Sequence, residues 1–381
     1  MSHLYRIVCV VAARPNLMKM APLLRAFGKP PLQVETILVH TGQHYDADMD
    51  SQFFSALEMG APDFRLDVGS ASHAVQTAEV MRRFEPVLDQ TAPAAVLVVG
   101  DVNSTLACAL TAAKKDIPVL HVEAGLRSHD RTMPEEINRV LTDQLSDLLF
   151  TSESGAMSNL LREGVPANRI HFVGNVMIDT LMLRLPYAPP AQTVLLRANL
   201  AGFIGREQPY ALLTLHRPSN VDDPRRLRAL METVAKLSTD VPVLFPLHPR
   251  TRAMLQSHDL ARLLDAPGVA CLPPLPYLDM LGLMKSACLV LTDSGGVQEE
   301  TTALGVPCLT LRENTERPVT VNEGSNAIAG RDPAVILALC RDILRYGGKT
   351  GRIPKYWDGR AAERVAGATV AWLANRREAR S

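Results

Sequence analysis

Two carboxylates stand just after apolar segments of the chain, where a folded α/β protein commonly places its chemistry. Residues 95–99 and 118–121 have the composition of buried strands, and they are followed by Asp101 and Glu123. Glu123 also opens a polar stretch, residues 121–139, that is crowded with charged side chains. Carboxylates that gather near one crevice raise one another's pKa, which lets a carboxyl group act as an acid or base near neutral pH. We therefore interpret Glu123 as a candidate acid or base, and Asp101 as a ligand-facing residue.

Two further carboxylates, Glu135 and Glu136, follow Pro134 at the start of a predicted helix, residues 134–145. Proline suits the first helical turn, and acidic side chains there interact favourably with the helix dipole. A structural role at the helix start is the simpler interpretation of this pair.

A glycine turn, DSGG at residues 293–296, joins the apolar segment 289–292 to a predicted helix, 297–304. The two glycines let the backbone approach a ligand closely. The free N–H groups of the first helical turn then favour an anion such as a diphosphate. The pattern is common, however, so by itself it leaves phosphate binding and an ordinary structural helix equally open.

Side chains around this turn narrow the choice only partly. Glu299 and Glu300 would repel a phosphate if they faced it, so we expect at least one of them to face hydroxyls of a sugar or ribose. Asp293 or Ser294 as an ordinary N-cap is the alternative explanation.

Two cations occupy a similar position in the first half of the chain. Arg14 follows the apolar segment 5–12, and Lys19 lies one turn into the predicted helix 17–27. A parallel sheet presents its ligands at the carboxyl ends of its strands. There, Arg can hold a pyrophosphate through paired hydrogen bonds and Lys as a point charge. Two solvated cations are the simpler interpretation if these residues are taken alone.

Apolar strand-like segments alternate with helical segments along the chain, which predicts an α/β fold with two Rossmann-like domains. The proline-rich stretch 186–191 is the clearest linker. It separates a first domain, residues 1–185, from a second, residues 186–358. We expect the final helix, within residues 359–381, to pack back on the first domain. Candidate ligand groups end strands in both domains, so we expect the site in the crevice between them.

Composition limits the class of protein. The chain has 381 residues, 47% apolar, with 40 basic and 40 acidic side chains, which argues against a nucleic-acid binder. No apolar run reaches the roughly 18 residues of a membrane span, and the first residues lack a signal-peptide pattern. The six cysteines stand singly in apolar segments, which favours reduced core thiols in a cytoplasmic protein.

The sequence offers little support for a cofactor or a metal. No G-x-G-x-x-G follows the first strand-like segment and no Walker sequence occurs, which removes the main support for dinucleotide or ATP binding. His40 and His44 are four residues apart but lie on a strand and a turn, where the helical spacing of metal ligands does not apply. We therefore expect no cofactor and no metal.

Taken together, the motifs resemble those of the non-hydrolysing UDP-N-acetylglucosamine 2-epimerases over nearly the whole chain. HVEAGLR with PEEINR and DSGGVQEE is a highly specific combination. The resemblance rests on ARP (13–15) with Lys19, TGQH (41–44), GD (100–101), HVEAGLR (121–127), PEEINR (134–139), HR (216–217), HP (248–249), DSGGVQEE (293–300) and TERP (315–318).

The resemblance implies a cytoplasmic homodimer with a fold like that of the GT-B glycosyltransferases. It implies interconversion of UDP-GlcNAc and UDP-ManNAc by elimination of UDP, a 2-acetamidoglucal intermediate and re-addition of UDP. The implied catalytic set is Asp101, Glu123, Glu135 and His216. The implied substrate-binding residues are Arg14, Lys19 and Arg317 at the phosphates, the backbone near Leu275 and Met280 at the uracil, and Ser294, Gly295, Gly296 and Glu300 at the phosphates and ribose.

Two departures from the family pattern border the site. The family usually has GTRPE where this chain reads AARPN (12–16), and Arg-Glu or Ala-Glu where this chain has Pro218-Ser219. Relatives that act on diacetamido-uronic acid sugars show ARPQ at the first motif, which is nearer to ARPN. Their later motifs carry QKE and a Trp, where this chain keeps QEE (298–300) and ERP (316–318). The later motifs favour plain UDP-GlcNAc.

Other functions stay open from the sequence. A GT-B glycosyltransferase would release UDP only when an acceptor sugar is present, and an epimerase could act on a modified UDP-GlcNAc. A hydrolysing epimerase would accumulate free ManNAc, and a non-catalytic sensor would bind UDP-GlcNAc without turnover.

Overall fold

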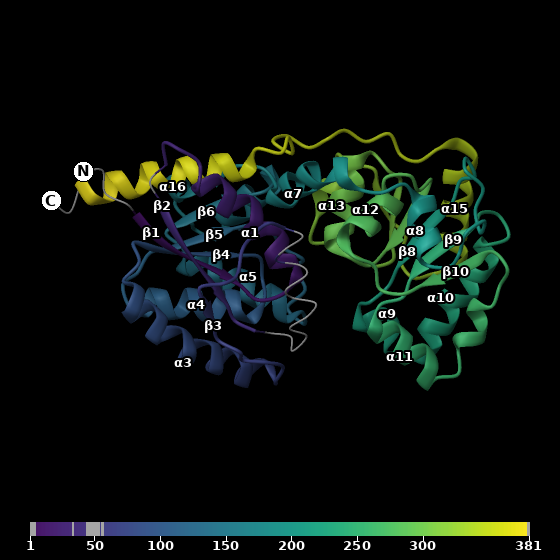
Figure 1. The fold of residues 1–381 in the computed structure, drawn as a ribbon, viewed down its shortest axis with the longest axis horizontal. Coiled ribbons are helices and arrows are strands. Elements are labelled where there is room, and N and C mark those ends of the chain that lie inside the picture. Colours follow the sequence, from purple (N-terminus) through teal and green to yellow (C-terminus); the bar gives the residue numbers. More distant parts are fainter. Residues whose placement is uncertain (1–4, 33, 43–53, 55–56, 379–381) are drawn as a thin grey trace. The chain divides into compact units, whose positions relative to one another are not determined.

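The computed structural model describes residues 5–32, 34–42, 54 and 57–378 (Figure 1). The backbone of Arg14 is described but its side chain is not. The chain divides into two compact units: Met1–Thr180 with Lys355–Ser381, and Leu181–Pro354. The first division falls inside helix α7 (Val176–Arg184), not at the proline-rich stretch that the sequence offered as a linker.

The proline-rich stretch belongs to the second unit for a physical reason. Its prolines begin a short 3-10 turn, Leu185–Tyr187, and precede helix α8 (Ala191–Arg197). Ala188 is buried against Leu181 and Leu281. Ala188, between Pro186 and Pro189, therefore packs into a core where a linker residue would stay solvated.

The first unit is built on a parallel seven-stranded sheet in the order β3-β2-β1-β4-β5-β6-β7, the order of a Rossmann fold. The two-residue edge strand β3 has too little sequence pattern to be predicted. The strands are β1 (Tyr5–Val11), β2 (Val34–His40), β3 (Phe64–Arg65), β4 (Ala95–Val99), β5 (Val119–Val122), β6 (Leu148–Thr151) and β7 (Ile170–Phe172).

The C-terminal helix, α16 (Ala361–Glu378), packs against α1 in the first unit. Asp179 fixes its start by accepting hydrogen bonds from the backbone N–H groups of Ala361 (3.1 Å) and Ala362 (2.7 Å). Trp357 anchors the preceding segment by donating to the carbonyl of Ser152 (3.0 Å). The other helices of this unit are α1 (Arg14–Phe27), α3 (His73–Thr91), α4 (Asn103–Lys114), α5 (Pro134–Leu145), α6 (Ser154–Arg162) and the start of α7, with a 3-10 turn at Ala167–Arg169.

The second unit is built on a parallel six-stranded sheet in the order β10-β9-β8-β11-β12-β13. Its strands are β8 (Ala211–Thr214), β9 (Val243–Pro246), β10 (Val269–Leu272), β11 (Leu289–Thr292), β12 (Cys308–Thr310) and β13 (Asn326–Ile328). Its helices are α8, α9 (Pro218–Val221), α10 (Pro224–Leu237), α11 (Pro249–Ser257), α12 (Tyr277–Met284), α13 (Gly295–Leu304), α14 (Pro318–Asn322) and α15 (Pro333–Tyr346), with a 3-10 turn at Ala261–Leu264.

Both faces of the second sheet are covered by apolar side chains, which explains why its strands read as unbroken apolar runs. Leu213 and Leu291 face one apolar cluster, whereas their neighbours Leu212 and Val290 face the other. Polar side chains are consequently confined to the strand ends, where the candidate residues of this unit lie.

Two smaller findings concern burial. Cys271 is exposed, contrary to the expectation of core thiols, because it alternates with the buried Ala270 and Leu272 on the edge strand β10. Within the described part of the chain, no helix is long and apolar enough to cross a membrane.

Candidate functional site

Glu123 lies directly after β5, with its carboxylate turned into the first unit. Its Oε2 forms an ion pair with Lys19 Nζ, and the two side chains are only 6% and 8% exposed. Gly100, at the end of β4, makes room for the pair: a Cβ there would lie 3.1 Å from Lys19 Nζ and 3.3 Å from Glu123 Oε2. The structure therefore joins one predicted phosphate-binding cation to one predicted catalytic carboxylate.

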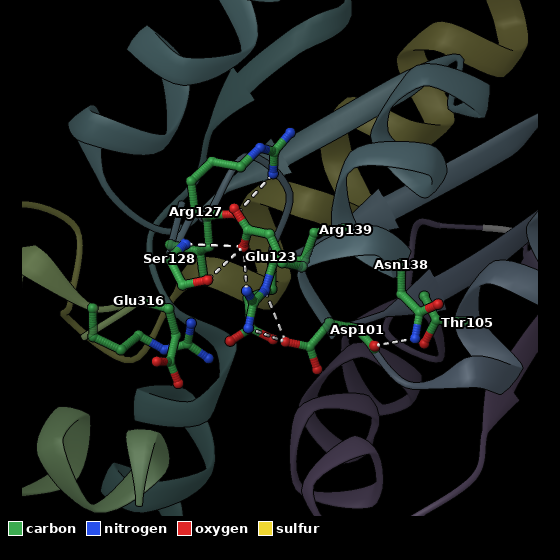
Figure 2. Close-up of polar contacts among 12 residues, drawn as sticks. Asp101, Thr105, Glu123, Arg127, Ser128, Asn138, Arg139 and Glu316 are labelled. Carbon is green, nitrogen blue, oxygen red and sulfur yellow. Dashed lines mark hydrogen bonds and ion pairs between the residues drawn. The ribbon is translucent and has the colours of Figure 1, made fainter. Parts of the chain in front are cut away.

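Asp101 follows Gly100 at the same edge of the sheet and is held by two residues of α5. Arg139 donates to its carboxylate from Nε (2.9 Å) and Nη2 (2.7 Å) (Figure 2). Asn138 donates to its backbone carbonyl (2.9 Å). The carboxylate of Asp101 stays 23% exposed, whereas the Arg139 side chain is 3% exposed. Asp101 is thus accessible to a reactant while its orientation is fixed.

Glu136 closes the loop between β5 and α5. Its carboxylate accepts hydrogen bonds from the backbone N–H groups of Ser128 (2.9 Å) and His129 (2.9 Å), and from Arg139 Nη1 (2.6 Å). Burial alone would raise the pKa of Glu136, but these bonds from Ser128, Arg139 and His129 hold the pKa below its ordinary value. Glu136 therefore has a structural role, and Glu135 beside it is half-buried in the first turn of α5.

Helix α5 is amphipathic in the opposite sense from an ordinary surface helix. It buries Glu136, Arg139 and Asp143, whereas Ile137 and Leu141 are 42% and 46% exposed. A charged face can be buried only where its groups are paired or hydrogen-bonded. The polar interior of the first unit supplies those partners.

In the second unit, α13 begins at Gly295, two residues earlier than predicted, so both glycines lie in its first turn. Ser294 takes the N-cap position, but its side chain forms no capping hydrogen bond within the described part of the chain. A Cβ at Gly295 would lie 2.7 Å from Glu316 Oε1, so a larger residue here would displace that carboxylate. The helix start keeps backbone N–H groups that suit an anion.

Asp293 does not cap α13, so of the two N-cap candidates, Asp293 and Ser294, the structure places Ser294 at that position. It is fully buried and accepts hydrogen bonds from the backbone N–H groups of His216 (3.2 Å) and Arg217 (3.0 Å), and from Asn220 Nδ2 (3.1 Å). Burial would raise the pKa of Asp293, but the side chain of His216 and these other donors hold the pKa below its ordinary value.

His216 is oriented by that buried carboxylate. Its Nδ1 lies 3.1 Å from Asp293 Oδ1, and its side chain is 37% exposed. The ring of His248 lies 5.5 Å away, measured between ring centroids. A histidine fixed at one ring nitrogen by a carboxylate and exposed elsewhere is the usual arrangement of a histidine that moves a proton or binds a polar ligand.

Glu299 and Glu300 have different partners. Glu299 Oε1 is 2.7 Å from Arg317 Nε, and these side chains are 1% and 7% exposed, so Arg317 is committed to an ion pair in this structure. Glu300 accepts a hydrogen bond from Tyr277 Oη (2.8 Å). Burial raises the pKa of Glu300 to about 7, with a smaller contribution from the charge of Glu299, against the lowering effect of the Tyr277 bond.

For the remaining predicted binding residues, the structure shows either apolar packing or no described side chain. The side chains of Leu275 and Met280 are half-buried and pack against an apolar cluster of the second unit. Arg14 begins α1, but its side chain lies outside the described residues, as do Gln43 and His44 of the TGQH motif. The described residues hold no group of three His, Cys, Asp or Glu side chains placed to bind a metal ion.

A sequence model of the family described as UDP-N-acetylglucosamine 2-epimerase matches residues 29–369. The chain belongs to this family. It is 41% identical to the UDP-N-acetylglucosamine 2-epimerase of Methanococcus maripaludis over 345 residues, which cover 90% of this chain and 92% of that protein.

Two other similarities bear on substrate and fold. The chain is 40% identical to the UDP-2,3-diacetamido-2,3-dideoxy-D-glucuronate 2-epimerase of Pseudomonas aeruginosa, covering 95% of this chain and 98% of that protein. The crystal structure of the Methanocaldococcus jannaschii UDP-GlcNAc 2-epimerase in complex with UDP-GlcNAc and UDP matches with a TM-score of 0.85 and 39% identity. That match covers 96% of this chain and 99% of that chain. With two parallel sheets in Rossmann-like units, this UDP-GlcNAc 2-epimerase family member has a GT-B-like fold.

Sequence reasoning overlooked several residues of this epimerase family member that hold its candidate site together. Arg139 pairs with Asp101, and His121, Arg127 and Asp143 form a buried network behind it. A signal was present in α5: Glu136, Arg139 and Asp143 recur at spacings of three and four, which puts them on one helical face. The expectation that charged residues face solvent masked it.

Proposed function

We propose that the chain inverts C2 of UDP-GlcNAc to give UDP-ManNAc, reversibly and without hydrolysing the nucleotide sugar. The observation that carries the proposal is a pair of carboxylates at one edge of the first sheet. Glu123 is held beside Lys19, and Asp101 beside Arg139. They occur in a chain that is 41% identical to one UDP-N-acetylglucosamine 2-epimerase.

The chemistry follows from the substrate. The C2 hydrogen of a GlcNAc unit is not next to a carbonyl group, so its direct removal would give an unstabilised carbanion. Loss of UDP from C1 creates an oxocarbenium-like centre, and this centre makes the C2 hydrogen acidic. A base then removes the proton to give 2-acetamidoglucal. Protonation of C2 from the other face and re-addition of UDP at C1 complete the inversion.

Inversion requires proton-transfer groups on both faces of the sugar. We assign this work to Asp101, Glu123, Glu135 and His216, and leave open which carboxylate serves which face. Asp101 has an exposed carboxylate with a fixed orientation, and His216 has one ring nitrogen oriented by Asp293. A fixed orientation together with access to a reactant supports both as general acid–base candidates.

The nucleotide is assigned to the second unit. The turn Ser294-Gly295-Gly296 would bind the phosphates at the start of α13, where the Ser294 side chain makes no capping hydrogen bond among the described residues. The N–H of Ser294 donates to Thr292 Oγ1 (3.0 Å), so we assign the phosphate contacts to the Ser294 hydroxyl and to the N–H groups of Gly295 and Gly296. Glu300 would accept hydrogen bonds from the hydroxyl groups of the ribose. The uracil would meet the backbone near Leu275 and Met280, and Arg14, Lys19 and Arg317 would complete the phosphate contacts.

The proposal is tested with UDP-GlcNAc alone in deuterated water, followed by NMR of the sugar. We expect UDP-ManNAc to form without added cofactor and to carry deuterium at C2. Asp101→Asn and Glu123→Gln should each lower turnover by about 10²–10⁴-fold, the usual contribution of a general acid or base. Product that keeps its C2 hydrogen would refute the elimination mechanism. UDP release that depends on an added acceptor sugar would instead indicate a glycosyltransferase.

A second substrate is favoured by one observation, the 40% identity to the diacetamido-glucuronate epimerase of Pseudomonas aeruginosa. A uronate would bring a second anionic group that needs a cation. In the first unit, Arg139 and Arg127 are each paired with two carboxylates, and Lys19 is assigned to the phosphates, which supports a neutral sugar. Comparing kcat/KM for the two nucleotide sugars decides between them.

Assembly and location complete the proposal. We propose a cytoplasmic homodimer, supported by six free cysteines and by the exposed Ile137 and Leu141 on α5. Light scattering in solution tests the dimer, and a monomer mass at micromolar protein would refute it.

A further inference from the structure

A buried polar network lies directly behind the carboxylates of the first unit. His121 is on β5, Asp143 is near the end of α5, and Arg127 is in the loop that joins these elements. The side chains of His121 and Asp143 are fully buried, and that of Arg127 is 2% exposed. We propose that His121 and Asp143 are positioning residues for the epimerisation, which fix the relative placement of Glu123, Asp101 and α5. This inference rests on the proposed function.

Each ring nitrogen of His121 has a partner within hydrogen-bond distance. Its Nε2 lies 2.9 Å from the carbonyl oxygen of Gly100, which can only accept. Its Nδ1 lies 2.7 Å from Asp143 Oδ1. Asp143 Oδ2 in turn accepts from the backbone N–H of Gly125 (3.1 Å) and from Arg127 Nη2 (2.7 Å). His121 thus joins the Gly100 peptide to Asp143.

The charge of this network is balanced within the same unit. Arg127 pairs with Asp143 and also with Glu163, to which its Nε (2.8 Å) and Nη2 (2.6 Å) donate. Burial would lower the pKa of Arg127, but the bonds to Glu163 and the charge of Asp143 raise it. The Arg127 guanidinium is thus paired with two carboxylates, as a buried charge requires.

One end of the network holds Gly100, which is in contact with the catalytic carboxylates. Gly100 is left-handed (φ 69°), and its N–H donates to the carbonyl of Val122 (3.1 Å) while its own carbonyl accepts from His121. The open face of its Cα lies against Lys19 and Glu123, and Asp101 is the next residue. A shift of the Gly100 peptide would therefore displace both Glu123 and Asp101.

The other end holds the turn that carries Glu123. Glu123 has a left-handed backbone (φ 72°), which costs energy for a residue with a side chain and persists only where neighbours enforce it. Asp143 binds the N–H of Gly125, two residues later, and so helps to enforce this turn. Because Asp143 lies on α5, one side chain connects the turn of Glu123 to the helix that bears Glu135 and Arg139.

A buried network could also serve stability alone, so the test needs a matched control. Asp179 is a buried carboxylate of the same unit that accepts the N–H groups of Ala361 and Ala362, at the start of α16. In both Asp143→Asn and Asp179→Asn, the new side-chain NH₂ group replaces a carboxylate oxygen that accepted a hydrogen bond from a backbone N–H. Both should lower Tm, and only Asp143→Asn should disturb the carboxylates.

We expect Asp143→Asn to lower kcat for UDP-GlcNAc epimerisation by about 10–100-fold, the effect of misplacing catalytic groups by about 1 Å. Its KM should stay near that of wild type, because most of the nucleotide contacts assigned above lie on the second unit and Asp143 contacts none of the residues that make them. Asp179→Asn should keep the kcat of wild type at temperatures where it is folded. Equal kcat values for the two variants, or a loss of Asp143→Asn confined to KM, would overturn the inference.

A second pair of variants, both at His121, keeps the inference testable if Asp143→Asn fails to fold. His121→Gln can keep a donor near Gly100 O, whereas His121→Asn keeps only the donor toward Asp143. We expect His121→Gln to retain more kcat at a similar Tm, and the reverse order would contradict the role of Gly100. An active wild type with indistinguishable variants would refute this inference alone, whereas an inactive wild type would refute the proposed function as well.

Discussion

Glu300→Gln should stabilise the second unit at alkaline pH and have little such effect at acidic pH. The Glu300 carboxyl is buried, and its pKa is about 7, compared with an ordinary value of 4.5. Between these two pH values the folded state binds more protons than the unfolded state, so stability falls as pH rises. Glutamine is neutral at every pH and keeps an oxygen that can accept from Tyr277.

The size of the expected change in the free energy of unfolding follows from the pKa shift of Glu300. A difference of 7 minus 4.5 is 2.5 pKa units, and at 1.36 kcal/mol per unit this corresponds to about 3 kcal/mol. Relative to wild type, Glu300→Gln should therefore gain about 3 kcal/mol between pH 4.5 and pH 8. Any pH-independent effect of the amide cancels in this comparison, as does the titration of Asp179, whose pKa burial raises to about 6 in the other unit.

The assay must report on the second unit. Both tryptophans, Trp357 and Trp372, lie in the first unit, so their fluorescence serves as an internal reference. Hydrogen exchange of β11 and α13, measured in urea at the two pH values, reports on the second unit. The matched control is Glu299→Gln, which removes the partner of Arg317 and should destabilise this unit at pH 8.

Two outcomes would refute the reasoning. If Glu300→Gln changes stability equally at both pH values, Glu300 does not titrate between them in the folded protein. If the variant is less stable than wild type at pH 8 but not at pH 4.5, the carboxylate is stabilised by a charge, and its pKa is lowered instead of raised.

Two further predictions concern the first unit. Glu136→Gln should show the opposite pH dependence. Against the effect of burial, the bonds from Ser128, Arg139 and His129 lower the folded pKa of Glu136. The stability that this carboxylate contributes is therefore present above its ordinary pKa and lost as pH falls. Thermal unfolding should show the variant destabilised at pH 7 and nearly equal to wild type in acid; a constant difference would contradict this. Gly125→Ala should destabilise the fold or prevent it, because a Cβ there would lie 2.5 Å from the carbonyl oxygen of Ala156 in a left-handed backbone (φ 79°), and a wild-type Tm for this variant would contradict the packing.

The sequence by itself predicted most of the elements and the positions where the longer strands end. Strand β4 was predicted at residues 95–99 and is found there, because a strand buried on both faces is a local run of apolar residues. The same logic placed Asp101 and Glu123 after neighbouring strands. Glycine and proline marked the starts of α5 and α13 to within two residues, because their backbone preferences are local.

Only the tertiary structure decided which of these residues are partners. Lys19 and Glu123 are 104 residues apart, and Arg139 and Asp101 are 38 apart, yet each pair forms an ion pair. The short strands β3 and β13 are likewise defined by the strands beside them. An ion pair or a strand pairing depends on the distance between elements, and that distance is set by how whole helices pack on a sheet. The buried charges of α5 are the clearest case, since local pattern assigns charge to solvent and only the packed unit supplies the partners that make burial possible.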